Sequence, residues 1–243
     1  MIRRLLNHAR QAQYGTLFFE LVVVVIGILF ALSIDDWRQE REELEQEHEY
    51  LVAIKADLQE DLRMFDERIF PEIKMRLEKS KQLGQVTPES VPESLEAQRM
   101  FVDDIGRAGF MNTYRPRRNA MDDMLATGNL RLLSNRQLRL DLLGYYDKVE
   151  QMQPYDDWGR KLIWENFRNE FTGFIPLDAV HMRAQNREAA PRESFVAIVQ
   201  NEIFQRGLLN VRGMAEWQQQ RYKGIYDEVS RLIEIVDEEI SRK

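Results

Sequence analysis

Hydrophobic residues recur along most of this chain at the spacing of an α-helix. Between residues 36 and 70 one apolar residue returns every seven positions: Leu44, Leu51, Leu58 and Phe65. This is an amphipathic stripe close to the coiled-coil period. Segments 135–153 and 208–241 carry apolar residues three and four apart, and no stretch of any length alternates with the two-residue period of a β-strand. The pattern predicts an all-α protein that ends in a helical bundle.

The N-terminal region contains one apolar block over residues 16–34, in which Glu20 is the only charged residue. A helix of this length rises about 28 Å, close to the ~30 Å hydrocarbon core of a bilayer. We therefore expect a transmembrane helix over 16–34. Gly27 and Ala31 are small residues one turn apart, which would let two transmembrane helices approach closely. Glu20 is a further candidate for such association, because an ionisable residue within a membrane segment often faces a partner helix. The alternative for Glu20 is a carboxylate close to the membrane surface.

The charges around this block predict its orientation. Three arginines precede it within residues 1–15, and two aspartates follow it directly. The positive-inside rule then places residues 1–15 in the cytoplasm and the rest of the chain outside it. A cleaved signal peptide is the alternative, because a basic start and an apolar stretch loosely fit that design. The length of the block and the presence of Glu20 within it favour an anchor that stays attached.

These boundaries divide the chain into four parts. Residues 1–15 form a cytoplasmic segment and residues 16–34 the transmembrane helix. Residues 35–84 form a stalk helix continuous with it, with a kink near Pro71, since proline interrupts a helix. Residues 85–243 form a helical extracytoplasmic domain, which opens with a loop that contains two prolines.

Composition excludes several classes of function. The chain of 243 residues has a net charge of −7, which argues against nucleic acid as a partner because phosphate binding needs a basic face. It contains no cysteine, so disulfides, thiol chemistry and cysteine-ligated metals are excluded.

Short motifs give no sign of catalysis. Glu45-x-x-His48 has the spacing of one half of a carboxylate-bridged di-iron site, but the second such motif is missing from the sequence. The chain also lacks a P-loop, a Gly-x-Ser-x-Gly elbow and a His-Glu-x-x-His motif. We therefore predict no catalytic residue, no cofactor and no metal site, and interpret Glu45 and His48 as surface residues of the stalk helix.

Residues 114–118, Tyr-Arg-Pro-Arg-Arg, form the densest basic site of the chain. One interpretation is an anion-binding pocket made by Arg115, Arg117 and Arg118. The other is a loop whose arginines pair with nearby carboxylates, for which the sequence offers Asp103, Asp104, Asp122 and Asp123.

Two stretches resemble a known family. Gly27-Ile-Leu-Phe-Ala-Leu-Ser-Ile-Asp-Asp-Trp37, preceded by Glu20, resembles the N-terminal Gly-Ile-Leu-x-Ala-Leu-x-Ile-x-x-Trp signature of a family of bacterial single-pass membrane proteins of unknown function. Thr127-Gly-Asn-Leu-Arg-Leu-Leu-Ser-Asn135 and the later Tyr145-Tyr146 are similar to the Ser/Thr-Gly-Asn-Leu element and Tyr-Tyr helix of that family. The resemblance implies a single pass through the bacterial inner membrane, with most of the chain periplasmic. It implies no activity.

We expect a non-catalytic role in binding, scaffolding or assembly of an envelope complex. The expected partners are the lipid bilayer and either further copies of the chain or another membrane protein. A ligand-sensing domain is the alternative, and it would signal through a membrane partner because residues 1–15 are too short to form an output domain. An enzyme remains a third hypothesis, since unusual active sites leave no short motif.

Overall fold

The computed structural model describes residues 2–169, 189 and 191–242, with side chains described from Val22 onward apart from three residues near the end of the first range. Within these ranges every regular element is a helix, which confirms the all-α prediction for this part of the chain. The elements are α1 (Ile2–Met64), η1 (Phe65–Ile69), α2 (Phe70–Gly84), α3 (Leu95–Ala108), α4 (Asn119–Thr127), η2 (Asn129–Leu132), α5 (Arg136–Ile163), η3 (Trp164–Asn169), α8 (Arg192–Gln200) and α9 (Glu202–Ser241).

The first long helix ends in a wider turn. α1 leads directly into η1, a π-helical turn, and α2 starts at Phe70 with Pro71 in its first turn. Proline is tolerated there because the first N–H groups of a helix have no intrahelical partner. The kink expected near Pro71 stays a prediction.

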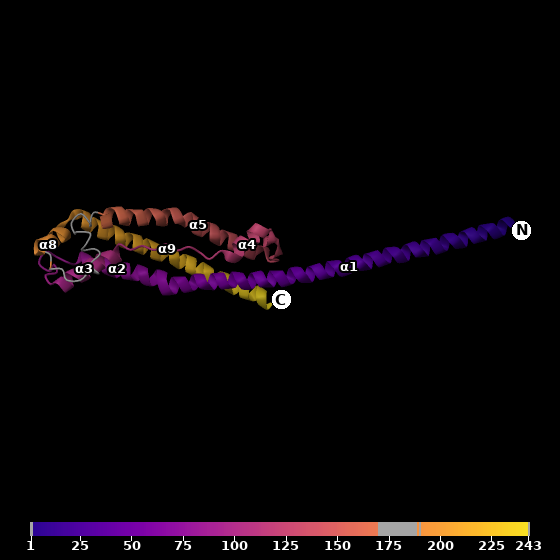
Figure 1. Ribbon diagram of the computed structural model, residues 1–243, viewed down its shortest axis with the longest axis horizontal. Helices are drawn as coiled ribbons and strands as arrows, with labels where there is room; N and C mark the ends of the chain where they lie inside the picture. Colours follow the sequence, from indigo (N-terminus) through magenta and orange to yellow (C-terminus); the bar gives the residue numbers. More distant parts are fainter. Residues whose placement is uncertain (1, 170–188, 190, 243) are drawn as a thin grey trace.

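Three long helices, α1, α5 and α9, lie side by side along the body of the molecule (Figure 1). Their facing stripes form the main core, which includes Leu51, Ile54, Leu58, Leu142, Tyr145, Ile225, Val229 and Leu232, all at most 1% exposed. From Leu51 onward the heptad stripe of α1 thus packs within the same chain. Leu44, one heptad earlier, is 49% exposed and lies outside this core.

A second core lies at the end of the molecule away from the N-terminus. It joins the end of α2, α3, η3, α8 and the start of α9, through residues that include Leu83, Phe101, Ile105, Phe167, Phe195, Ile198 and Leu208. α4 and η2 pack at the opposite end of α5 (Figure 1). The two cores share α2 and α9, which bind the two ends into one elongated body.

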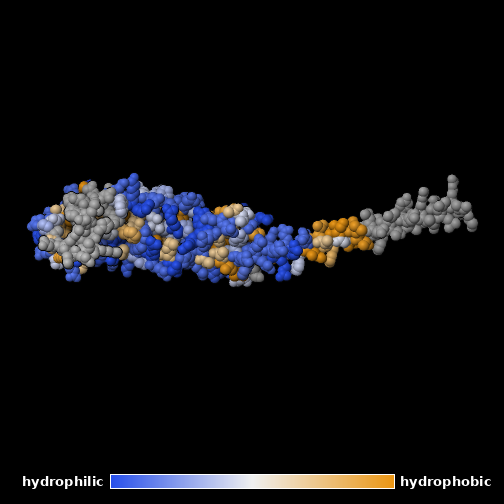
Figure 2. All heavy atoms as spheres, in the orientation of Figure 1, coloured by the Kyte–Doolittle hydropathy of each residue, from blue (hydrophilic) through white to orange (hydrophobic). Residues whose placement is uncertain are grey.

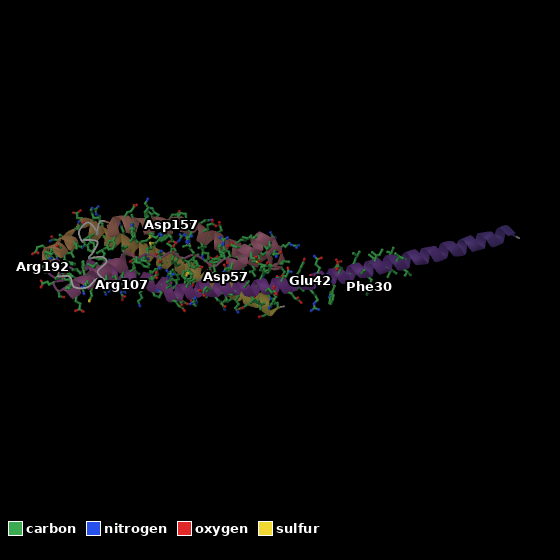
Figure 3. All side chains as sticks on the ribbon, viewed as in Figure 1. Phe30, Glu42, Asp57, Arg107, Asp157 and Arg192 are labelled. Atoms are coloured by element: carbon green, nitrogen blue, oxygen red, sulfur yellow. The ribbon has the colours of Figure 1, made fainter. Side chains whose placement is uncertain are left out.

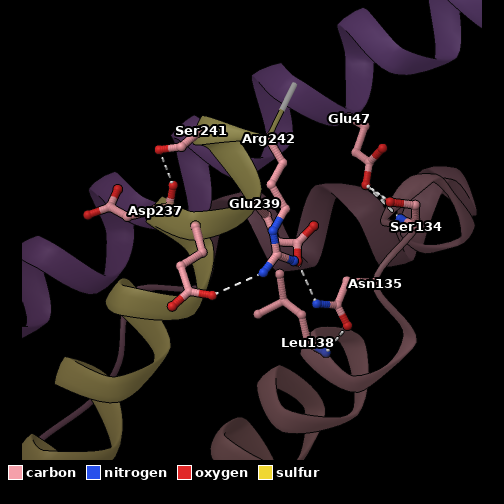
Figure 4. A network of polar contacts seen from close by, with 9 residues as sticks. Glu47, Ser134, Asn135, Leu138, Asp237, Glu239, Ser241 and Arg242 are labelled. Atoms are coloured by element: carbon pink, nitrogen blue, oxygen red, sulfur yellow. Dashed lines mark hydrogen bonds and ion pairs between the residues drawn. The ribbon is translucent and has the colours of Figure 1, made fainter.

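Hydrogen bonds join the start of α5 to α1 and to the end of α9 (Figure 4). The buried Glu47 carboxylate accepts hydrogen bonds from the backbone N–H of Ser134 at 2.6 Å and from its hydroxyl at 2.8 Å. Asn135 caps α5 by accepting from the N–H of Leu138 at 3.0 Å, and its amide donates to Glu239 at 2.8 Å. The start of α5 is therefore fixed to both neighbouring helices.

Part of α1 leaves the bundle. Residues 22–37, here called the projecting segment, extend beyond the ends of the other helices (Figure 1), and their surface is strongly hydrophobic (Figure 2). Phe30, on this segment, lies on the part of α1 that extends beyond the bundle (Figure 3). Phe30 is 68% exposed.

The predicted transmembrane helix over residues 16–34 is wrong, and with it the predicted single-pass location in the inner membrane. In the part of the chain that could be searched, no helix is both long and apolar enough to cross a bilayer. Among the residues whose side chains are described, the apolar run covers Val22 to Ile34, about 20 Å of helix, and Asp35 follows directly. The side chains of residues 1–21, Glu20 included, lie outside the described residues.

Candidate functional site

The three arginines proposed for anion binding lie on a linker, residues 110–118, which joins α3 to α4 without regular structure. Arg118 lies over the ring of Tyr146, 5.1 Å from its centroid, and its guanidinium is 3.2 Å from Asp122. Arg117 lies 3.7 Å from Glu60, and Arg115 is exposed. Two of the three thus pair with carboxylates, as the second interpretation predicts for Asp122. Anion binding here stays a prediction.

The backbone of this linker is held by side chains from all three long helices. Tyr222 on α9 accepts from the N–H of Tyr114 at 3.0 Å, and Gln153 on α5 donates to the Tyr114 carbonyl at 2.9 Å. At Arg117, the N–H donates to Asp61 at 2.9 Å and the carbonyl accepts from the Tyr146 hydroxyl at 3.1 Å. An extended segment inside a helical bundle has no neighbouring strand, so side chains must satisfy its buried backbone groups.

The side chains that hold the linker form a buried polar network. Asp61 lies at the centre of one half of this network. Its side chain is fully enclosed, and besides the N–H of Arg117 it accepts the hydroxyl of Tyr145 at 3.0 Å. The hydroxyls of Tyr145 and Tyr114 lie 2.5 Å apart. Burial raises the pKa of the Asp61 carboxyl to about 6, although the hydrogen bonds it accepts act in the opposite direction. Burial also raises the pKa of both tyrosines, which stay protonated.

Asp156 and Arg76 form the other half. Tyr222 donates to the Asp156 carboxylate at 2.7 Å, and burial raises the pKa of that carboxyl. Arg76 is 2% exposed and donates to Gln218, whose amide in turn donates to the carbonyl of Asn112 at 3.2 Å. Burial lowers the pKa of Arg76 to about 10, so its guanidinium remains charged at neutral pH. These groups hold the linker in place and face the protein interior.

No cluster of three metal-ligating side chains is found in the ranges that the structure describes. Glu45 and His48 lie beside each other in a shallow depression on α1 that Arg242 also lines. His181 lies outside the described residues. A raised carboxyl pKa is typical of a general acid, but Asp61 is enclosed and both of its oxygens accept hydrogen bonds, so its position suits support of the linker.

The residues proposed for helix association lie on the projecting segment or just before it. A Cβ placed on Gly27 would have no atom within 4 Å, and Ala31 is exposed. In the described part of the chain both therefore remain open to a partner.

The sequence matches a family model described as "Family of unknown function (DUF6090)" over residues 20–157, more than half of the chain. The chain belongs to this family. The search of curated proteins and the search of solved structures each found no match. The resemblance drawn from the sequence is thereby confirmed as far as membership of an uncharacterised family.

The DUF6090 range covers both motifs that carried the resemblance, and it ends within α5 at Asp157. It includes the projecting segment, the linker and Asp61. Gln218 and Tyr222, which complete the buried polar network, lie on α9 outside it. Membership of DUF6090 brings no assigned activity.

Sequence reasoning missed the buried polar network. One signal was present, since Asp61 stands among the apolar residues of the α1 stripe, between Leu58 and Phe65, and Gln218 stands one turn before Tyr222 on α9. A polar residue within an apolar stripe indicates a buried hydrogen-bonded group. Its partners on other helices lie far away in sequence and leave no local pattern.

Proposed function

We propose that this protein has a non-catalytic binding role, in which several copies assemble through the projecting segment and the helical bundle provides a rigid platform for the assembly. The observation that carries this proposal is the exposure of the segment. Ten of its large apolar side chains, from Val23 to Trp37, are each 45% to 68% exposed. Soluble monomers rarely leave a continuous apolar surface of more than a few hundred Å² uncovered.

The energies favour a partner that covers most of the segment. Fully burying one such side chain contributes about 1.5–3 kcal/mol, so covering the exposed half of one contributes roughly 1 kcal/mol. Ten side chains then contribute about 10 kcal/mol, of the same order as the ~4–15 kcal/mol cost of association. Exposed side chains occupy consecutive positions, as from Val23 to Ile26, and therefore point to all sides of the helix, so one partner helix covers only part of them. The proposal is therefore a bundle of several projecting segments.

The charges support a second copy of the chain as the partner. Residues 22–34 carry no charge, so identical segments meet without repulsion. In the following turns Arg38 lies 3.9 Å from Asp35 and 3.4 Å from Glu42 on the same helix. Within each chain Arg38 thus offsets part of the negative charge of these turns, which reduces the repulsion between identical helices.

Gly27 and Ala31 support close approach of the helices. The distance between two packed helices depends on the side chains at their contact, and small residues shorten it. Both residues belong to the Gly-Ile-Leu-x-Ala-Leu signature in residues 27–32. In this proposal the signature is the association element of the chain.

The test is the oligomeric state of the full-length protein, measured by chemical crosslinking and native mass spectrometry. We expect oligomers for the natural sequence and mainly monomers for Phe30→Glu, which places a charge at the most exposed apolar position of the segment. Leu44→Glu is the matched control, because Leu44 is an exposed apolar residue on the same helix outside the segment. A strict monomer at high concentration, or equal effects of the two substitutions, would contradict the proposal.

A further inference from the structure

The outer groove between α5 and α9 opens into a cleft of about 480 Å³. This volume lies in the range of small-molecule sites, about 300–1,000 Å³. α5 contributes Gln151, Tyr155 and Trp158 to its walls. These residues follow one another at intervals of four and three, which places them on one face of the helix.

α9 contributes the opposite wall, with Gly213, Trp217 and Arg221 four residues apart and therefore also on one face. At one side of the cleft the two helices approach closely. A Cβ placed on Gly159 of α5 would lie 2.7 Å from the sulfur of Met214, which lines the cleft. The cleft is thus fixed by close packing of two rigid helices.

The walls of the cleft are aromatic and exposed. Tyr155 is 59% and Trp158 is 58% exposed, although large apolar rings gain from burial. The rings of Tyr155 and Trp217 lie 6.3 Å apart between centroids, at 48° to each other, so that they do not cover each other's faces. The exposed rings of Tyr155 and Trp158 suit a planar apolar group that stacks against them.

Among the described residues that line the cleft, Arg221 is the one with a charge. It lies over the ring of Trp217, 5.2 Å from its centroid, and none of these residues is a carboxylate, although the chain as a whole has a net charge of −7. Among the described residues Arg221 forms no ion pair. Burial raises the pKa of Asp156, against the smaller effect of the charge of Arg221, which lowers it. The Asp156 carboxyl is buried and does not line the cleft. A guanidinium held on an aromatic face offers a planar pair of donors that fits a carboxylate.

Gly213 leaves space in the wall. No atom lies within 4 Å of the position that its Cβ would take, and glycine inside a helix is less favourable than alanine. Packing within the chain therefore does not require glycine at this position. A larger side chain here would project into the cleft.

We propose that this cleft binds a planar, mainly apolar small molecule that carries one carboxylate, with the ring system against Tyr155 and Trp158 and the carboxylate on Arg221. The inference is independent of the assembly of projecting segments, because the cleft lies on the helical bundle. In this proposal α5 and α9 bind a small molecule in addition to forming part of the helical core.

The test uses isothermal titration calorimetry on the full-length protein with two probes of equal shape, 2-naphthoate and the uncharged 2-naphthamide. We expect 2-naphthoate to bind at least tenfold more tightly. Arg221→Gln should bring the two affinities within about twofold of each other, and Gly213→Leu should weaken both by tenfold or more. Phe30→Glu should leave both unchanged, which separates this inference from the proposed assembly.

Two matched controls exclude general effects of the substitutions. Gly224→Leu places the same side chain at another open glycine of α9, and Arg206→Gln removes another exposed arginine of that helix. Both should bind like the natural sequence. The proposal is overturned if the natural sequence binds neither probe at millimolar concentration, if it does not prefer the carboxylate, or if Gly213→Leu binds as well as Gly224→Leu.

Discussion

The hydroxyl of Tyr145 on α5 donates a hydrogen bond to the carboxylate of Asp61 on α1, with the two oxygens 3.0 Å apart and both side chains fully buried. A buried polar group costs free energy unless it is hydrogen-bonded, so this pair requires both helices to be in register. The hydroxyl of Tyr114 extends the contact to the linker between α3 and α4. Three segments that are distant in sequence thus depend on one enclosed polar cluster.

The protonation of Asp61 makes stability depend on pH. Burial raises its pKa to about 6 in the folded protein, above the ordinary value of 3.8, so the folded state binds the proton more tightly than the unfolded state. This stabilisation is complete below about pH 3.8 and is lost as the pH rises through about 6. Its upper limit is about 3 kcal/mol. Between pH 4 and pH 7 the natural sequence should therefore lose stability relative to Asp61→Asn, which does not titrate.

Urea denaturation at pH 4, 5.5 and 7 measures this difference in the free energy of unfolding. Asp66→Asn is the control, because Asp66 is an exposed carboxylate that accepts the hydroxyl of Tyr226 at 3.3 Å. A difference between the natural sequence and Asp61→Asn that stays constant across this range would contradict the assignment.

Loss of the Tyr222 hydroxyl should destabilise the fold. Tyr222→Phe leaves the N–H of Tyr114 without its acceptor and removes a donor from the buried Asp156. We expect a loss of about 1–3 kcal/mol in the free energy of unfolding. Tyr226→Phe, whose hydroxyl reaches only an exposed carboxylate, should cost less than about 0.5 kcal/mol in the same denaturant titration. Equal losses of unfolding free energy in the two variants would show that the buried network does not contribute to stability.

Two glycines should respond in opposite directions to alanine. Gly128 follows α4 with φ of 74°, in the left-handed region, so Gly128→Ala should cost about 1 kcal/mol or more. Gly144 lies inside α5 on an exposed face with no atom near its Cβ position, and Gly144→Ala should add up to about 1 kcal/mol. Thermal unfolding measures whether each variant has a lower or a higher melting temperature than the natural sequence. A shift of both melting temperatures in the same direction would contradict the prediction.

Glu47 should protect the start of α5. Glu47→Ala removes the acceptor of the Ser134 N–H and hydroxyl, so we expect faster hydrogen exchange at the amide of Ser134 and a loss of about 1–3 kcal/mol. Glu49→Ala, at an exposed position two residues later, should leave exchange at Ser134 unchanged. Unchanged exchange in Glu47→Ala would mean that other contacts hold this turn.

Local signals in the sequence account for several elements. Ser94 and Asn135 cap α3 and α5, as their positions before apolar runs indicate, and Gly128 adopts the left-handed turn that its place after α4 requires. α5 continues through Pro154, although proline removes one backbone hydrogen bond from a helix. Its flanking residues Met152 and Asp156 are both buried, so packing on either side maintains the helix despite the lost hydrogen bond.

Composition alone misled at the N-terminus. The block over residues 16–34 looks long enough to span a bilayer, yet no helix among the residues that could be searched is sufficiently long and apolar. In the structure, residues 23–34 of this block are exposed.

The sequence by itself determined that this chain is helical, since a period of 3.6 residues, caps and glycine turns act over a few neighbouring residues. It also marked which face of each helix is apolar. Only the tertiary structure decided which faces meet, that Asp61 pairs with Tyr145 across 84 positions, and that aromatic residues of α5 and α9 enclose a cleft. Such contacts join residues that are distant along the chain, and their formation depends on how whole helices pack.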